Sequence, residues 1–336
     1  MNHPIKTFDS LPQALPVPLR SAGRAESRAV PLVGVIRNPR SFRNMGLAPE
    51  QAARAEVITE TTHKRQELFE VLARFAGAGI DYLAIDGGDG TVRDVLTWGA
   101  SAFGDDWPPL IVLPKGKTNA LAADLGLSPR WDLDSALERA SAGSFAHRRT
   151  LVVAEADDPQ ARVQGFMLGA GVFTRSISLG QSAHRWGAFN SLAVVVTTFW
   201  TLAQAFFAGG DNPWRQLAGI RVTDEHGRPI AGDDPQRYVL LSSTLENFPM
   251  GLKPFGAVRK GLKLAILDRP WRESLLRIPQ IAFGRQPGNG ERLGYHWLAP
   301  DSYLMTLEDR FILDGEAFPP GAYRISLGPE LRFVVP

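Results

Sequence analysis

The residues best suited to chemistry follow a short apolar segment, residues 82–85, and include three glycines, an aspartate and a threonine. They are Gly87, Gly88, Asp89, Gly90 and Thr91. Glycines let the backbone turn tightly and let another group approach closely. Thr91 is a suitable cap for a following helix, whose N–H groups and positive dipole end would face the turn. The stretch therefore predicts a strand, a turn and a helix that bind phosphate or another anion; a plain strand-to-helix turn is the alternative.

Asp89 places a negative charge inside this predicted phosphate site. The carboxylate and a phosphate would repel each other without a cation between them. Magnesium takes oxygen ligands and commonly joins one or two carboxylates to phosphate oxygens. We therefore expect Mg²⁺ at Asp89.

Two further apolar segments, residues 32–37 and 110–113, also end in polar turns. In open α/β folds the carboxyl ends of parallel strands meet at one edge, where ligands bind. An ammonium group in such a turn is a good point-charge partner for phosphate. The polar residues of these two turns are Asn38, Lys117, Thr118 and Asn119.

Two carboxylates lie close together late in the chain, at Asp314 and Glu316, on either side of Gly315. One interpretation is an Asp-Gly hairpin turn after the strand predicted at residues 310–313. The other is catalytic, with one carboxylate accepting the proton of a hydroxyl that attacks a γ-phosphate. The phosphate-binding turns earlier in the chain favour the catalytic interpretation.

The order of these motifs resembles the diacylglycerol kinase catalytic family. The motifs are Asn38-Pro39, Gly87-Gly88-Asp89-Gly90-Thr91, Pro114-x-Gly116-x-x-Asn119 and Asp314-Gly315-Glu316. The resemblance runs from about Pro31 to the C-terminus. The family includes bacterial lipid kinases and sphingosine and ceramide kinases, and it is distantly related to NAD kinases.

The resemblance implies an NAD kinase-like doubly wound α/β domain followed by an antiparallel β-sandwich domain. It implies ATP and Mg²⁺ as cofactors and a lipid hydroxyl as acceptor. It also implies that Asn38 and a threonine lie near the nucleotide; Thr62 fits the spacing better than Thr61. By the same resemblance Glu316 is the catalytic base and Asp314 assists it.

The sequence departs from the family at several positions. Lys117 stands where relatives usually carry threonine, and Ala120 where they carry aspartate. Asp124, one helical turn later, is a candidate replacement for that carboxylate, and a surface aspartate is the alternative. Arg93 replaces an asparagine, and a solvated position in the first helical turn would explain it.

A basic loop is the second departure. Several bacterial relatives have an acidic magnesium-binding loop before the strand that corresponds to residues 261–267. Lys253, Arg259 and Lys260 occupy that region here, so we do not expect this structural metal site. The basic side chains either face anionic lipid headgroups or are solvated.

The rest of the sequence predicts the helices, strands and domains that position these motifs. Helices are expected at residues 63–79, with Leu68, Val71, Leu72 and Phe75 facing the sheet, at 92–100, and at 132–142, capped by Asp132. Short strands are expected at 149–156, 162–168, 217–223, 237–243 and 261–267, with final strands at 323–327 and 331–335. We predict a flexible leader at 1–29, a nucleotide-binding domain at 30–148 and a β-sandwich acceptor domain at 149–324. Residues 325–336 are predicted to return to the first domain.

Composition limits the alternatives. The 336 residues include no cysteine and have a net charge of only +2. The chain therefore has no disulfides, and its net charge does not indicate that it binds nucleic acid. Residues 187–208 carry no charge, but they include several polar residues and interrupt the predicted β-domain. We expect a helix there that lines a lipid pocket, lies in the membrane interface or is buried, rather than a membrane span.

We therefore predict an ATP-dependent lipid kinase that phosphorylates diacylglycerol or a related lipid. It is expected in the cytoplasm, peripheral to the inner face of the membrane, and a homodimer is left open. The alternative function is a catalytically impaired lipid- or nucleotide-binding protein of the same fold, for which Lys117 and Ala120 speak. A kinase of a soluble alcohol is a third hypothesis.

Overall fold

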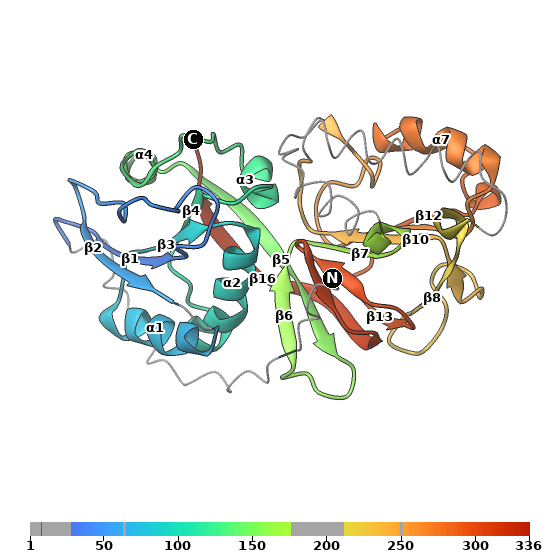
Figure 1. Ribbon diagram of the computed structural model, residues 1–336, viewed down its shortest axis with the longest axis horizontal. Coiled ribbons are helices and arrows are strands. Elements are labelled where there is room, and N and C mark those ends of the chain that lie inside the picture. The colour runs from blue at the N-terminus through green and yellow to red at the C-terminus, as the bar shows by residue number, and fades with distance from the viewer. Residues whose placement is uncertain (1–7, 9–27, 63–64, 176–211, 249–250) are drawn as a thin grey trace. The chain divides into compact units, whose positions relative to one another are not determined.

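The computed structural model describes residues 8, 28–62, 65–175, 212–248 and 251–336 (Figure 1). The described chain forms two compact units. One, here the α/β unit, contains Phe8–Val152, Gln160–Gly165 and Gly328–Pro336; the other, here the β unit, contains Val153–Pro159 and Phe166–Leu327. The chain therefore passes between the units several times.

The α/β unit is built on parallel strands in the order β2–β1–β3–β4. Their bounds are Leu32–Arg37 for β1, Glu56–Thr61 for β2, Tyr82–Gly87 for β3 and Leu110–Pro114 for β4. β1 and β4 are buried at every position and β3 at all but its first, as central strands covered on both faces should be. The three strands predicted to carry the motifs are thus confirmed.

β2 is a strand that the sequence pattern did not predict. It pairs in parallel with β1 and leaves every side chain at least partly exposed. Its sequence, Glu-Val-Ile-Thr-Glu-Thr, contains two glutamates, which suit an edge strand better than a central one.

Helices cover both faces of these strands, with α1 and α2 on one side and α4 on the other (Figure 1). The bounds are Arg65–Ala78 for α1, Asp89–Phe103 for α2, Ala120–Asp124 for α3 and Leu133–Ser141 for α4. The residues predicted to line α1's inner face, Leu68, Val71, Leu72 and Phe75, are buried. Asp132 caps α4 as predicted by accepting the Ser135 N–H at 2.9 Å. The predicted start of α2 at residue 92 is wrong, because the helix begins inside the glycine turn.

The β unit is antiparallel. One sheet has the order β12–β11–β10–β7–β14–β15, and β13 pairs with β8 and with the first part of β16. The sheet strands are β7 Met167–Gly171, β10 Val239–Ser243, β11 Lys263–Leu267, β12 Tyr295–Leu298, β14 Phe311–Leu313 and β15 Glu316–Phe318. The others are β8 Ala218–Thr223, β9 Gln236–Arg237 and β13 Ser302–Leu307. A helix, α7, spans Arg272–Ala282. The predicted fold class is therefore confirmed.

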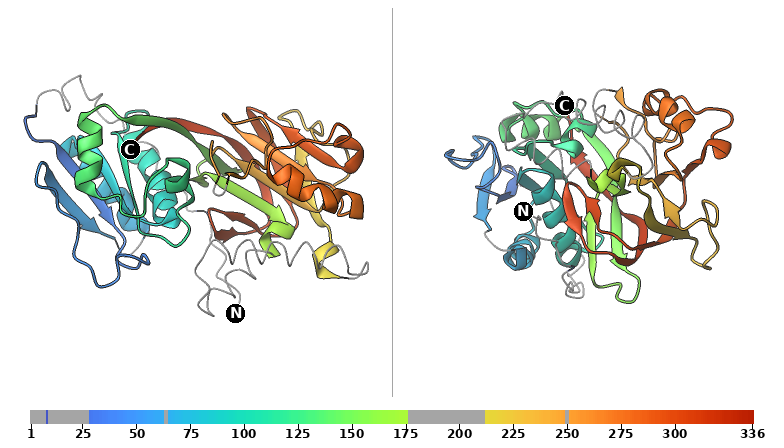
Figure 2. Two further views of the ribbon diagram at one scale, coloured as in Figure 1. Left: turned by 90° about the horizontal axis from the view of Figure 1, so that it is seen from above. Right: turned by 45° about the vertical axis from the view of Figure 1, so that its right-hand side comes forward.

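Two long strands run through both units. β5 spans Phe145–Glu155 and pairs with β6, Arg162–Gly165, and with β16. The two predicted final strands form one strand, β16, Gly321–Val334, drawn as a long red ribbon in Figure 2. Its end pairs in parallel with β4 through Phe333 and Leu110.

Within the described residues, no helix combines the length and apolar character needed to cross a membrane. The helix predicted for the uncharged stretch 187–208 lies outside the described residues, as does almost all of the predicted leader.

The returning strand generates a stability prediction. Phe333 is fully buried in the α/β unit, so Phe333→Ala should lower the free energy of unfolding by about 3–5 kcal/mol. Glu330 is exposed on the same strand. Glu330→Ala should change the free energy of unfolding by no more than about 0.5 kcal/mol. Urea titration of both variants measures the two effects. Equal, small effects of the two variants would contradict the packing of β16 in this unit.

Candidate functional site

The carboxyl ends of β1, β3 and β4 bring the predicted turns together. Arg37 pairs with Asp86 across β1 and β3, and Gly87 pairs with Pro114 across β3 and β4. The residues that follow, beginning at Asn38, Gly88 and Lys115, therefore lie along one edge of the sheet. The Asn38 N–H donates to the Asp86 carbonyl at 3.0 Å and ties the first turn to the second.

The second and third turns touch backbone to backbone. A Cβ on Gly88 would lie 2.8 Å from the Gly116 Cα, and a Cβ on Gly116 would lie 2.6 Å from the Gly88 Cα. The Lys115 N–H also donates to the Gly87 carbonyl at 3.0 Å. Glycine is required at both positions by this close approach.

Asn119 closes the third turn on itself. Its backbone is left-handed, with φ of 52°, a conformation that asparagine adopts more readily than most residues. Its Oδ1 accepts the Gly116 N–H at 2.8 Å, and its Nδ2 donates to the Gly116 carbonyl at 2.9 Å. The predicted nucleotide residue Asn119 thus shapes the turn.

Asp89 contacts the same turn from the other side. Its carboxylate accepts the backbone N–H groups of Asn119, Ala120 and Leu121, which open α3. Burial raises the pKa of Asp89, while these three hydrogen bonds and the nearby charge of Arg93 lower it. Asp89 therefore caps a helix that is close in space but thirty residues away in sequence.

Thr91 does not cap α2, so that prediction is wrong. The residue before the helix is Gly88, and Thr91 lies within the first turn. Its Oγ1 accepts the Asn38 Nδ2–H at 2.9 Å, while the Asn38 Oδ1 accepts the Arg40 N–H at 3.0 Å. Two predicted nucleotide contacts, Asn38 and Thr91, are thus hydrogen-bonded to each other.

The other predicted nucleotide residues differ in how they are held. Lys117 and Thr118 are exposed at the tip of the third turn. The Lys117 Nζ lies 5.9 Å from the centroid of the Phe42 ring, which is itself exposed. Thr62 follows β2 and is partly buried; residues 63 and 64 lie outside the described residues, and its contact with a nucleotide stays a prediction.

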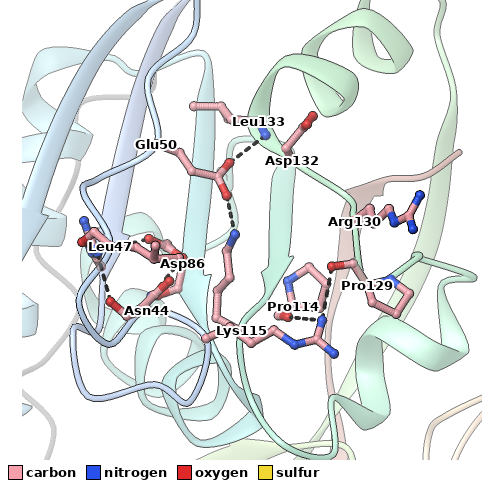
Figure 3. A network of polar contacts seen from close by, with 12 residues as sticks. Asn44, Leu47, Glu50, Asp86, Pro114, Lys115, Pro129, Arg130, Asp132 and Leu133 are labelled. Carbon is pink, nitrogen blue, oxygen red and sulfur yellow. Dashed lines mark hydrogen bonds and ion pairs between the residues drawn. The ribbon is translucent and has the colours of Figure 1, made fainter.

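A network that the sequence analysis missed holds residues 38–50 against this edge (Figure 3). Glu50 forms an ion pair with Lys115 and accepts the Leu133 N–H at the start of α4 at 2.9 Å. The Asn44 Nδ2–H donates to the Asp86 Oδ1 at 2.9 Å. The segment therefore joins the first turn, the third turn and α4.

Beneath this segment lies a buried ion pair between Arg37 and Asp86, 3.6 Å apart. Arg37 also donates to the Leu47 carbonyl at 2.5 Å. Burial raises the pKa of Asp86, opposed first by its hydrogen bond from Asn44. The sequence could have indicated this ion pair, because Arg37 and Asp86 carry opposite charges at the ends of two apolar segments that form adjacent strands.

Arg93, which departs from the family pattern, and the neighbouring or candidate acids Asp94 and Asp124 all have structural partners. Arg93 is fully buried and donates to Asp94 at 2.8 Å, so its interpretation as a solvated residue is wrong. Asp94 also binds Arg65, at the start of α1. Asp124 is buried and pairs with Arg148 at 2.7 Å, so it is not a surface aspartate. Its carboxylate is therefore engaged and does not take the place of the acid missing at Ala120.

Asp314 and Glu316 belong to the β unit. Asp314 and Gly315 have φ of 46° and 83°, the left-handed pair of a two-residue hairpin turn between β14 and β15. The Asp314 carboxylate accepts the Met167 N–H at 2.9 Å and the Phe166 N–H at 3.1 Å. These bonds interrupt the predicted strand 162–168 between β6 and β7. Glu316 opens β15 and is partly buried.

A magnesium site is not preformed in the described part of the chain. No three His, Asp or Glu residues there are grouped to hold a metal ion. The Asp89 carboxylate already accepts three N–H groups, and Ala120 provides no ligand. These residues do not fit a metal ion held by the protein alone.

Comparisons with known proteins agree with the motifs. Residues 35–152 match the profile of the diacylglycerol kinase catalytic domain, which confirms the resemblance over that segment. This match supports a phosphotransferase of a lipid kinase family that uses ATP and a lipid substrate. A search of curated proteins finds no match.

Solved structures share the fold. A crystal structure of "a putative diacylglycerol kinase from Bacillus anthracis str. Sterne" is 14% identical, with a TM-score of 0.65, and the match covers 92% of this chain and 98% of that one. A second structure from the same organism, described as a diacylglycerol kinase, is 13% identical, with a TM-score of 0.58 and the same coverage. At these identities the likeness concerns the fold.

The glycine contact generates a mutational prediction. Gly116→Ala would place a methyl group against the Gly88 backbone and should lower stability by about 1–3 kcal/mol, as overpacking does. Gly77→Ala, in α1, meets no atom within 4 Å and should be neutral or stabilise by about 0.5–1 kcal/mol. Urea unfolding compares the two variants. A Gly116→Ala protein as stable as Gly77→Ala would show that the turns do not touch.

Asp89 gives a second prediction. Asp89→Asn removes the charge that three N–H groups share, so it should lower stability by about 1–2 kcal/mol in metal-free buffer without nucleotide. The comparison is urea unfolding of both proteins in a chelator. If the variant keeps its stability and instead loses only magnesium-dependent nucleotide affinity, Asp89 is a metal ligand and not principally a cap.

Proposed function

We propose that this protein is an ATP-dependent lipid kinase that phosphorylates a hydroxyl of diacylglycerol or a related lipid. The observation that carries the proposal is the backbone contact between the two glycine turns. It lies at the carboxyl edge of a parallel sheet, within the segment that matches a diacylglycerol kinase catalytic domain.

In this proposal the phosphates of ATP bind over the turns at Gly87, Gly88 and Gly90. The first-turn N–H groups of α2, a helix of 15 residues, supply the positive end of a helix dipole. Exposed Lys117 adds a charge from the neighbouring turn. The remaining proposed contacts are Asn38, Thr62, Thr91, Thr118 and Asn119.

Magnesium bound together with the nucleotide would offset the charge of the phosphates. Asp89, which the sequence analysis assigned to the metal, would approach it from the glycine turn. The three N–H groups bound to that carboxylate support a positioning role instead.

Glu316 is the proposed general base. The acceptor oxygen attacks the γ-phosphorus, the bond from that phosphorus to the β-phosphate oxygen breaks, and ADP leaves. The acceptor proton passes to the Glu316 carboxylate. Asp314 would assist by fixing the hairpin, because its carboxylate is held by the Phe166 and Met167 N–H groups.

The second candidate is a protein that binds nucleotide or lipid without catalysis. Ala120 favours it, since the carboxylate that relatives carry there is absent and Asp124 is engaged by Arg148. Thermal-shift measurements with nucleotides and lipids detect binding, and transfer of radiolabelled phosphate to diacylglycerol detects catalysis. Binding without transfer would select this candidate over the kinase.

The proposed chemistry predicts the effect of Glu316→Gln, which keeps the shape of the side chain and removes the base. Turnover should fall at least about a hundredfold, the lower range for a general base, and nucleotide affinity should change by no more than a few-fold. Glu330→Gln, at an exposed position of β16, is the matched control and should retain turnover. Near-normal turnover of Glu316→Gln would place the base elsewhere.

A further inference from the structure

Helix α7 exposes large apolar side chains to solvent. Trp271, just before the helix, is 49% exposed, Leu276 is 63% exposed and Phe283, just after it, is 60% exposed. Arg272, Leu276, Pro279 and Phe283 follow at intervals of four, three and four, which places them on one stripe of a helix. Leu275 and Ile281 are buried. The helix therefore packs on the β unit through one face and leaves a second apolar stripe uncovered.

A basic loop lies directly beside the end of α7. The Lys253 N–H donates to the Ala282 carbonyl at 2.7 Å, and the side chain of Lys253 lies against Gly284. Val258, Arg259 and Lys260 continue this loop and are exposed. We call the exposed residues of α7, its flanks and this loop the α7 surface.

The α7 surface carries a concentrated positive charge. Between residues 251 and 286 the one exposed acidic residue is Glu273. The exposed basic residues of the same segment are Lys253, Arg259, Lys260, Arg269, Arg272, Arg277 and Arg285. The whole chain has a net charge of only +2, so this excess is local. A surface that combines exposed leucine, tryptophan and phenylalanine with arginine is complementary to an anionic membrane interface.

A small cavity opens at the same place. Its volume is about 80 Å³, and its lining includes Lys253 and Arg259, the apolar Phe255 and Val258, and one carboxylate, Glu246, so the two basic side chains outnumber the single acidic one. Two cationic side chains next to apolar ones suit the phosphate of a lipid headgroup whose acyl chains remain in the bilayer.

We propose that the α7 surface docks on the anionic face of a lipid bilayer, with Leu276, Phe283 and Trp271 entering the interface and the basic side chains contacting headgroup phosphates. This deepens and rests on the proposed function, because a kinase of diacylglycerol meets its acceptor at a bilayer. It assigns that contact to a particular helix and loop of the β unit.

Vesicle sedimentation with the full chain tests the proposal. The protein should bind phosphatidylcholine vesicles containing phosphatidylglycerol and bind pure phosphatidylcholine much more weakly. The triple variant Lys253→Gln/Arg259→Gln/Arg285→Gln should lose about a hundredfold in affinity, at roughly fivefold per charge. Leu276→Asn/Phe283→Asn should also release the protein, including at high salt, where screening leaves apolar contacts as the main attraction.

A matched control removes three exposed charges elsewhere in the β unit, Arg221→Gln/Arg228→Gln/Arg324→Gln. It should retain binding to within a few-fold. If the control and the α7 triple variant lose vesicle affinity equally, only the total charge matters and the proposal is overturned. Unchanged vesicle binding of both α7 variants would overturn it as well. A change of solution mass in Leu276→Asn/Phe283→Asn without a change in vesicle binding would instead identify a second copy as the occupant.

Activity on a water-soluble short-chain diacylglycerol separates this inference from the proposed function. The α7 variants should phosphorylate the soluble acceptor at the unmutated rate while failing on vesicles. If the protein binds vesicles through α7 but phosphorylates neither acceptor, the docking proposal stands and the proposed kinase function is wrong.

Discussion

The contact between the Gly88 and Gly116 backbones is the constraint on which the proposed nucleotide-binding edge depends. Two turns from adjacent strands approach so closely that neither accepts a Cβ without a shift. This approach lets Asp89, at the start of one turn, reach the N–H groups that open α3 after the other. Asn119 then fixes the second turn through Gly116. The two turns are consequently joined by backbone and side-chain contacts, an arrangement that would favour the preorganisation of the proposed phosphate site.

Three pairs of opposite charges near these turns are formed within the protein. Arg37 forms an ion pair with Asp86, and Lys115 forms one with Glu50, at the end of the segment 38–50. Arg93 forms a third with Asp94 within α2. Removing one partner of the buried Arg37–Asp86 pair would cost far more than the pair contributes, because the remaining charge would be left without compensation. The arrangement therefore fixes residues 38–50 in one position over the edge of the sheet.

The sequence was most informative where structure is local. The strands β1, β3 and β4, the Asp132 cap and the Asp314-Gly315 hairpin follow from patterns spanning only a few residues, and all are present. Partners distant in the chain were not predictable in the same way. The Asp89 cap depends on a turn thirty residues away, and β2 depends on pairing with β1 that its charged sequence does not suggest. Helix α7 was missed because Pro279 interrupts its pattern.

The route of β16 has a consequence for how the molecule is made. Its Phe333 completes the sheet beside Leu110, 333 − 110 = 223 positions earlier in the chain. During synthesis the strands β1 to β4 therefore leave the ribosome with one side of β4 unpaired, and they wait for the entire β unit before β16 arrives. Unpaired strand edges are templates for aggregation. The edge of β4 is consequently exposed to wrong pairing until the last residues are made, and a nonsense mutation late in the gene would leave this gap in the sheet permanently open.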